Sequence, residues 1–397
     1  MKNIAVSKTD AALTCKRIAI SIAIALVFSV PFSPRKNIDM QGILLIISGS
    51  FALASLLFSL NIKKFTAFSY ARLLIVMFLL LSICSSLTQP HLIYNLLGAP
   101  QVRLGSLGLA SCVAVGLLCK QYTAKRTIAW LFGLGVAVSV ISIPYTLITL
   151  HSLHRFGGIF AQADIMACLL GVTCILGFSI VRMNTPYNRA ITTAICLLSV
   201  MLVLTETRSI IYLLLLAITV LALKELLSNP RYFRYAAVGT ALCILVVVFL
   251  LPQRLHNRGY LFESVTYRTE LFEAGIAATS THPLLGYGPG NLADALACDK
   301  LTADELQRTC EDGYYFNSSH VLFLDRVLMI GWPGGIVFLA LLLLALRRGF
   351  TGSKEQQIFA WILTLLCIYL LTNVTHILLE LLLWVLVFQC LKRISRA

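Results

Sequence analysis

The sequence predicts an all-α, polytopic integral membrane protein with about twelve transmembrane helices and one large loop on the outer side of the membrane. Three observations lead to this fold class. Hydrophobic residues make up 58% of the 397 residues and charged residues only 12%, and the mean hydropathy is +0.86. Apolar runs of about 17 to 25 residues follow one another with short polar breaks, as expected of helices that cross a hydrocarbon core. A soluble multidomain protein is therefore excluded.

The first apolar run follows Lys16-Arg17, and we expect it to stay in the protein as a span. The residues after it, Pro31-Phe32-Ser33-Pro34, lack the small-x-small pattern at which a signal peptide is cleaved. The expected spans are roughly 17–32, 41–60, 66–88, 104–119, 127–149, 163–181, 189–205, 208–226, 234–251, 320–346, 357–372 and 374–391. Nine spans thus occupy residues 1–251, the large loop occupies 252–319, and three spans follow in 320–397.

The net charge of +15 has a topological explanation. Lys and Arg collect in alternate short loops, which is the pattern that sets orientation in a membrane. With both termini in the cytosol, every cytosolic loop is basic, so we expect no nucleic-acid partner and an active face that looks outward. The cytosolic groups are then Lys63-Lys64, Lys120 with Lys125-Arg126, Arg182 with Arg189, Lys224 with Arg231 and Arg234, Arg347-Arg348 with Lys354, and Lys392-Arg393 with Arg396.

Most of the 12 cysteines lie inside apolar runs, where they behave as small hydrophobic residues. Only Cys298 and Cys310 share the large loop. Outside the cytosol these two can form a disulfide, and the sequence leaves a disulfide and two thiols equally open.

His320 lies where the large polar loop meets the next apolar run, and it is the best candidate for a general base. Histidine titrates near neutral pH and can accept a proton from a hydroxyl group. A helix N-terminus favours its neutral form, which a base requires. The alternative is helix capping or interfacial packing, which is the commoner role of a lone histidine.

Three arginines are candidates for binding a phosphate group. Arg208 lies in Thr205-Glu206-Thr207-Arg208-Ser209 between two apolar runs, where an unpaired charge is costly; a snorkelling arginine or a pair with Glu206 is the alternative. We expect Arg268 near the start of an amphipathic helix on the membrane surface. Arginine forks together with helix N-terminal amides suit a diphosphate, although a solvated arginine is the alternative reading for Arg268. Arg155 is a third possible member.

No His, Cys or acidic cluster has the spacing of metal ligands, and no Asp-x-Asp element is present. We therefore expect chemistry without a metal and without a cofactor.

Together these segments resemble the O-antigen ligase and polymerase superfamily of bacterial envelope glycan assembly. The resemblance covers roughly residues 150–340. It rests on Thr205 to Ser209, on Arg268 followed by His282-Pro283-Leu284-Leu285-Gly286-Tyr287-Gly288, on His320 followed by Gly331 and Gly334, and on Phe156 to Phe160 with Ala167. The chain departs from the family at Val321, where Asn is frequent, and at Met329, where Glu is frequent.

The resemblance implies a GT-C-like glycosyltransferase of lipopolysaccharide biosynthesis, inverting and metal-independent, in the bacterial inner membrane with its site facing the periplasm. Its donor would be an undecaprenyl-diphosphate-linked O-antigen glycan, and its acceptor a sugar hydroxyl of the lipid A core. His320 would be the catalytic base, and Arg208, Arg268 and Arg155 would bind the diphosphate.

Two other functions stay open. Polymerases of the same superfamily tend to have two sizeable outer loops, whereas here the loop from His151 to Gln162 is short, which favours a ligase. A transporter of lipid-linked glycan ranks lower, because the expected spans are nearly uncharged. Their exceptions are Arg72, Asp325, Arg326 and Glu380.

Overall fold

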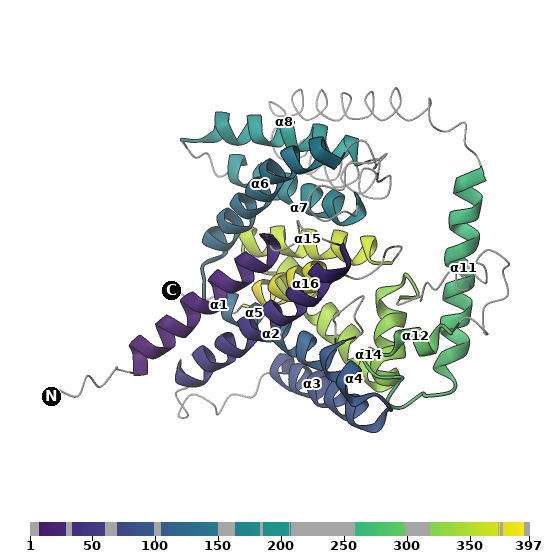
Figure 1. The fold of residues 1–397 in the computed structure, drawn as a ribbon. Coiled ribbons are helices and arrows are strands. Elements are labelled where there is room, and N and C mark those ends of the chain that lie inside the picture. Colours follow the sequence, from purple (N-terminus) through teal and green to yellow (C-terminus); the bar gives the residue numbers. More distant parts are fainter. Residues whose placement is uncertain are drawn as a thin grey trace. The chain divides into compact units, whose positions relative to one another are not determined.

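The computed structural model describes residues 8–28, 34–59, 70–98, 105–149, 163–182, 186–205, 207, 259–297, 318–371, 373 and 376–392. Within these ranges every regular element is a helix, which confirms the all-α fold class for this part of the chain (Figure 1). The helices are α1 (Lys8–Phe28), α2 (Pro34–Ser59), α3 (Tyr70–Thr88), α4 (Leu92–Leu97), α5 (Ser106–Cys119), α6 (Ala124–Thr149), α7 (Ala163–Arg182), α8 (Asn188–Leu204), α11 (Gly259–Thr279), α12 (Leu292–Ala295), α14 (Leu322–Phe350), α15 (Lys354–Tyr369) and α16 (Ile377–Cys390).

Ten of the twelve expected spans coincide with a helix, while those at 208–226 and 234–251 lie outside the described residues. Four helices of the described part are long and apolar enough to cross a membrane: α3, α6, α7 and α14. Shorter apolar segments lie at Ile43–Ser55, Ser106–Cys119, Asn188–Leu202 and Ile377–Cys390. The chain is thus a multi-pass membrane protein, and the number twelve stays a prediction.

The helices form two compact units. The first unit comprises Met1–Thr127, Glu270–Thr364 and Leu370–Ala397, and the second comprises Ile128–Thr269 and Leu365–Tyr369. In the second unit, α7 packs against α6 and α8 through glycines: a Cβ on Gly135 would lie 2.0 Å from Thr173 Oγ1, and one on Gly177 would lie 2.7 Å from Ile195. Small residues at such contacts let helix backbones approach closely.

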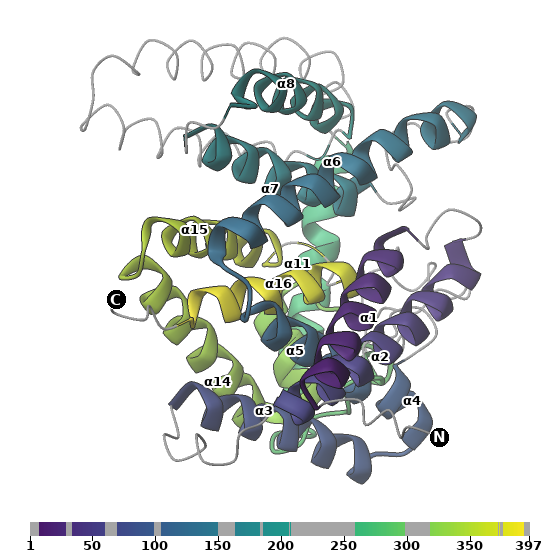
Figure 2. The ribbon, with the colours of Figure 1, turned by 90° about the vertical axis from the view of Figure 1, so that its left-hand side faces the viewer.

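The core of the first unit is an aromatic cluster shared by α3, α14 and α16. The Phe78 and Trp384 ring centroids lie 5.4 Å apart, and those of Phe78 and Phe338 lie 5.7 Å apart. On the next face of α16, Gly116 of α5 lies against Trp384 and Phe388, and Figure 2 shows α5 and α16 side by side. Gly116 permits this approach because a Cβ there would lie 2.8 Å from the Phe388 ring.

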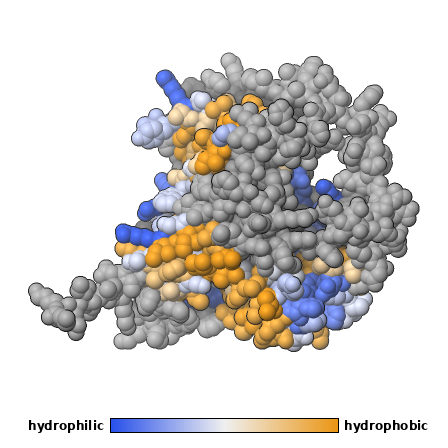
Figure 3. All heavy atoms as spheres, in the orientation of Figure 1, coloured by the Kyte–Doolittle hydropathy of each residue, from blue (hydrophilic) through white to orange (hydrophobic). Residues whose placement is uncertain are grey.

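The outer face of α14 carries an apolar stripe. Trp332, Ile336, Leu339 and Leu343 are exposed at spacings of three and four residues, which places them on one side of the helix. Figure 3 shows further apolar residues over α2 and α3. Exposed apolar surface of this kind is what a lipid-facing helix presents.

α14 is broken about a third of the way along its length, which the sequence did not predict. Ile330 and Gly331 depart from helical dihedral angles, and Gly331 has φ 74°. Pro333 follows directly and begins the second segment, because a proline is tolerated in the first turn of a helix. The helix therefore consists of a short segment from Leu322 to Met329 and a long segment from Trp332 to Phe350.

Three basic segments of the first unit, around Lys16, Tyr122 and Lys392, meet at one end of that unit. Lys16 Nζ donates to Gln121 Oε1 at 2.9 Å, Lys392 Nζ donates to the Tyr122 carbonyl at 2.6 Å, and Gln356 Nε2 donates to the Lys392 carbonyl at 2.7 Å. These contacts join α1, the α5–α6 loop, the start of α15 and the C-terminal end of α16.

None of the nine cysteines that the structure describes takes part in a disulfide. Cys298 and Cys310 lie outside the described residues, so the disulfide stays a prediction.

Candidate functional site

His320 lies in a tight turn directly before α14, as the sequence predicted. The turn consists of Ser318, Ser319 and His320, with Val321 as the N-cap of the helix. His320 has φ 60°, a left-handed conformation that non-glycine residues seldom adopt, although Asn, Asp and His adopt it more often than others. The residue as a whole is partly exposed, while its Nδ1 atom is buried. Nδ1 is therefore not the ring nitrogen that a substrate can reach.

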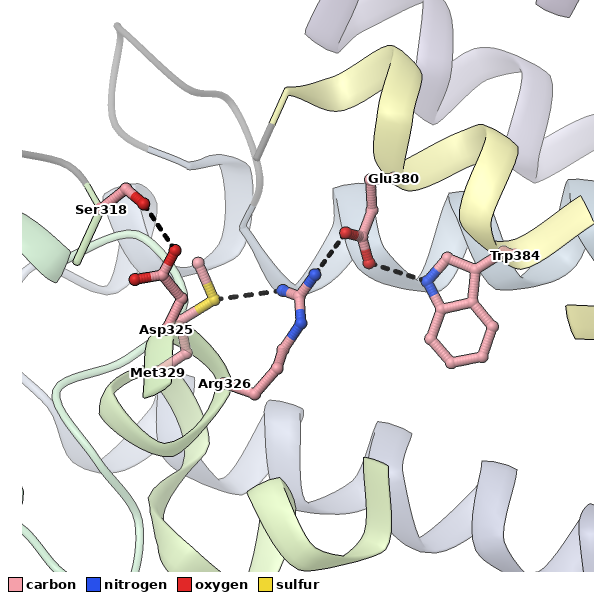
Figure 4. A network of polar contacts seen from close by, with 6 residues as sticks. All are labelled: Ser318, Asp325, Arg326, Met329, Glu380 and Trp384. Atoms are coloured by element: carbon pink, nitrogen blue, oxygen red, sulfur yellow. Dashed lines mark hydrogen bonds and ion pairs between the residues drawn. The ribbon is translucent and has the colours of Figure 1, made fainter. Parts of the chain in front are cut away.

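Asp325, one turn into α14, holds this turn in place (Figure 4). Its Oδ2 accepts a hydrogen bond from Ser318 Oγ at 2.7 Å, and its Oδ1 accepts from the Ser319 backbone N–H at 2.7 Å and from Ser319 Oγ at 2.8 Å. The carboxylate is 2% exposed. A buried carboxylate is tolerable only when it is hydrogen-bonded in this way.

The next residue, Arg326, forms a buried ion pair with Glu380 of α16 (Figure 4). The second carboxylate oxygen of Glu380 accepts from Trp384 Nε1 at 2.9 Å, and Arg326 also donates to Met329 Sδ at 3.3 Å and lies over the Phe338 ring. Both charged residues are at most 1% exposed. A buried pair costs several kcal/mol to break by removing one partner, so it ties the short segment of α14 to α16.

The glycine-rich segment from Pro283 to Gly290 closes the break in α14. The Tyr287 and Gly288 N–H groups donate to the Leu328 and Met329 carbonyls at 2.7 and 3.0 Å, and Trp332 N–H donates to the Pro283 carbonyl at 2.8 Å. The break frees these α14 groups from helical pairing, and buried backbone groups need a partner. The segment thus supplies hydrogen bonds that a continuous helix would supply itself.

Glycine is required here because backbones touch. A Cβ on Gly286 would lie 2.5 Å from the Leu328 carbonyl oxygen, and one on Gly331 would lie 2.2 Å from the Leu284 carbonyl oxygen. Both glycines also have positive φ, at 66° and 74°. The glycine-rich motif from His282 to Gly288, which the sequence singled out, thus contacts α14 backbone to backbone.

The turn between α3 and α4 is hydrogen-bonded to the same glycine-rich segment. Gln89 Nε2 donates to the Gly286 carbonyl at 2.8 Å, and Asn291 Nδ2 donates to the Pro90 carbonyl at 3.2 Å. Ser85 Oγ donates to the Met329 carbonyl at 2.8 Å. The His320 turn, the glycine-rich segment and the α3–α4 turn therefore belong to one end of the first unit.

Of the three arginines predicted to bind a diphosphate, one lies within the described residues, so their joint site stays a prediction. Arg155 and Arg208 lie outside those residues. Arg268 is partly buried on α11, but its expected place near the start of that helix is wrong, because α11 begins nine residues earlier at Gly259. No helix breaker lies between Gly259 and Arg268, so the helix extends back to the glycine. Arg268 therefore does not share a site with the N-terminal amides of α11.

The segment before Arg208 is tied to α7. α8 ends at Leu204, and the Thr207 Oγ1 hydroxyl donates to Asp164 Oδ1 at 2.9 Å. Thr205 Oγ1 donates to the Leu202 carbonyl at 2.7 Å, and both threonines are buried. α8 thus ends where the sequence predicted a break, and a carboxylate from the first turn of α7 holds the residues that follow it.

Residues 193–339 match the family model described as O-Antigen ligase. This segment is therefore similar to the O-antigen ligase family of the ligase and polymerase superfamily. The matched segment includes the Thr205–Thr207 turn, Arg268, the glycine-rich segment, the His320 turn and the break in α14. No match was found among curated proteins. The family implies a glycosyltransferase-like reaction of the ligase or polymerase type, with a lipid-linked sugar donor, at a membrane.

The sequence did not assign roles to Asp325, Arg326 and Glu380. Their signal was present, because they are charged residues inside apolar runs. Their partners were not predictable, since Arg326 and Glu380 are 54 positions apart.

Proposed function

We propose that this chain is an O-antigen ligase that transfers glycan from undecaprenyl diphosphate to a sugar hydroxyl of lipid A core in the bacterial inner membrane. The observation that carries the proposal is His320, which is held at the start of an apolar helix inside the matched segment. A polymerase of the same superfamily would use the same base with a different acceptor. The single large outer loop favours the ligase.

In the proposed reaction, His320 removes the proton of the acceptor hydroxyl. Because its Nδ1 is buried, the nitrogen that accepts this proton is Nε2. The one N–H proton of the neutral ring is then on Nδ1. The hydroxyl oxygen forms a bond to the anomeric carbon of the donor while the bond from that carbon to the diphosphate oxygen breaks. The electron pair leaves with the undecaprenyl diphosphate, and a single displacement inverts the anomeric configuration.

Arg208, Arg268 and Arg155 are the proposed ligands of the diphosphate. Negative charge grows on the diphosphate as it leaves, so cations fixed there stabilise the transition state more than the ground state. In this proposal the arginines take the part that a divalent metal takes in other transferases, and neither metal nor cofactor is required.

The arrangement of the first unit supports an orientation with both termini in the cytoplasm. α5 begins where Ser106 and Ser86 are hydrogen-bonded, close to the outer loops, and ends where the Cys119 carbonyl accepts from Gln389 Nε2 at 2.7 Å. α16 runs the same way, from Glu380 beside Arg326 to Lys392 beside Tyr122. The His320 turn and the basic cluster are therefore at opposite ends of these helices, and we propose that the His320 end faces the periplasm.

A deletion strain tests the reaction class. For a ligase, the strain makes lipid-linked polymer of normal length but attaches none of it to lipid A core. Loss of chain elongation would identify a polymerase instead, and accumulation of single repeat units on the cytosolic face would identify a transporter. Transfer by the purified protein should persist in excess EDTA, and loss of transfer on chelation would refute metal independence.

A further inference from the structure

The carboxylate of Asp325 needs an explanation, because an apolar residue would serve better in a buried position of an apolar helix. Burying a charge is costly unless its oxygens are hydrogen-bonded. Asp325 is 2% exposed, and three hydrogen bonds to its two oxygens come from only two residues, Ser318 and Ser319. All three of these hydrogen bonds therefore come from the turn that carries His320.

This arrangement differs from an ordinary helix cap. A capping carboxylate in the first turn reaches back to the N-cap N–H, which here belongs to Val321. Asp325 instead bonds residues two and three positions before the N-cap. Its effect falls on the approach to the helix rather than on the helix end.

The bonds of Asp325 complete a set that fixes three consecutive N–H groups. Ser319 N–H donates to Asp325, His320 N–H donates to Ser318 Oγ at 3.0 Å, and Val321 N–H donates to Ser319 Oγ at 3.4 Å. The two serine hydroxyls that accept these bonds are themselves held by Asp325. The carboxylate thus organises the turn as a unit.

The direction of the His320 side chain depends on this turn. The left-handed conformation at φ 60° sets the direction of the Cα–Cβ bond, and a return to a right-handed conformation would swing the ring away. Strained conformations persist only where the surroundings determine them. With Nδ1 buried, only one nitrogen can serve as the base, so its position is critical for the reaction.

We propose that Asp325 is a positioning residue for His320: its carboxylate holds the Ser318–His320 turn so that Nε2 reaches the acceptor hydroxyl. The inference rests on the proposed function of His320 as the base. Asp325 itself touches neither substrate, because it is buried behind the turn.

The first test is Asp325→Asn, which keeps the size of the side chain. The amide oxygen can still accept hydrogen bonds, but the NH₂ group cannot accept from a serine hydroxyl, so the turn loses at least one of its three bonds to this side chain. Because misplacement of a catalytic group by about 1 Å can cost ~10²-fold, we expect kcat to fall by about that factor with KM for the lipid-linked donor unchanged. Native kcat in this variant would overturn the proposal.

The second test separates positioning from general destabilisation. In the double variant Asp325→Asn with His320→Ala, the base is already absent, so we expect the residual transfer rate to equal that of His320→Ala alone. Losses that multiply would mean that Asp325 acts independently of His320, and would overturn the proposal.

A matched control is Gln356→Ala at the opposite end of the first unit. Gln356 is also buried and also ties a turn by hydrogen bonds, through the Lys392 carbonyl and the Ser353 N–H. This variant should reduce the amount of folded protein while leaving kcat per folded molecule unchanged, and its effect should be independent of His320→Ala. If Asp325→Asn behaves in the same way, its role is only structural.

Failure of the inference is distinguishable from failure of the proposed function. If His320→Ala is slow but Asp325→Asn is not, His320 stays the base and only the positioning role is wrong. If His320→Ala itself transfers at the native rate, both the base and the positioning role are refuted.

Discussion

His320 combines two properties that are unusual at one residue. It is the proposed base, and it has a left-handed backbone conformation, which costs a non-glycine residue roughly 1 to 2 kcal/mol. Backbone strain of this kind is retained where it orients a functional side chain. The conformation also provides a way to separate the effect of the ring from the effect of the backbone.

The comparison of His320→Asn with His320→Ala uses this property. Asn tolerates the left-handed conformation better than Ala, so we expect His320→Asn to unfold at nearly the native temperature and His320→Ala to lose about 0.5 to 1 kcal/mol of stability. Both lack the base and should transfer glycan ~10² to 10⁴-fold more slowly. Thermal unfolding and single-turnover transfer in detergent measure the two effects, and native transfer by His320→Asn would contradict the assignment.

For the arginines, the planar fork matters more than the charge. Arg208→Lys and Arg268→Lys keep a positive charge but lose bidentate binding of phosphate oxygens, so we expect transfer to fall by ~10²-fold or more in each. Arg347→Lys, an exposed change in the last turn of α14, is the control and should leave transfer unchanged. Transfer at the native rate by Arg208→Lys would contradict the proposal that the Arg208 guanidinium binds the diphosphate.

At the scale of elements, the glycine-rich segment and the two parts of α14 form one structural unit. N–H groups of the segment donate to the last carbonyls of the Leu322–Met329 part. The Trp332 N–H, at the start of the other part, donates to the Pro283 carbonyl. A change that separates the backbones should therefore affect the whole outer end of the first unit.

Gly331→Ala tests this contact against Gly133→Ala. The first substitution places a Cβ 2.2 Å from a backbone oxygen at positive φ, whereas Gly133 of α6 has no heavy atom within 4 Å of such a Cβ. We expect Gly331→Ala to lose several kcal/mol of stability and Gly133→Ala to gain up to about 1 kcal/mol. Yield and unfolding temperature in detergent are the measurements, and equal stability of the two variants would mean that the contact is looser than described.

Helix positions were predictable from the sequence, because each apolar run is stabilised by lipid separately from the others. The ends of α5, α7 and α16 agree with the expected spans to within about three residues. The start of α11 was missed since no local signal distinguishes a helix that starts at Gly259 from one that starts near Arg268. The pair of Arg326 and Glu380 and the docking of Gly286 on α14 depend on contacts between distant segments, which periodicity does not contain.

At the scale of the whole molecule, the arrangement within the first unit agrees with the distribution of charge along the chain. Lys16 and Lys392 meet at Gln121 and Tyr122, and the α3–α4 turn meets the glycine-rich segment near the other end, where the His320 turn precedes α14. Neighbouring parts of one end should therefore report the same side of the membrane.

Accessibility labelling of cysteines in whole cells measures on which side of the membrane each end of the first unit lies. Single cysteines introduced at Gln121 and Lys392 should react only after the inner membrane is permeabilised, whereas the native Cys298 and Cys310 should react from the periplasm, after reduction if they are paired. A cytosolic position for residue 290 would refute the orientation and with it the proposed donor site.

The break in α14 also determines how deep its charges lie in the bilayer. At about 1.5 Å per residue, the segment from Trp332 to Leu346, which ends before Arg347-Arg348, is roughly 22 Å long. A hydrocarbon core is about 30 Å thick, so the last residues before the break would complete the crossing. Asp325 and Arg326 would then lie near the boundary of the core, where charged side chains cost far less than at the bilayer centre. A proton removed from an acceptor at His320 would have only a short path to bulk water.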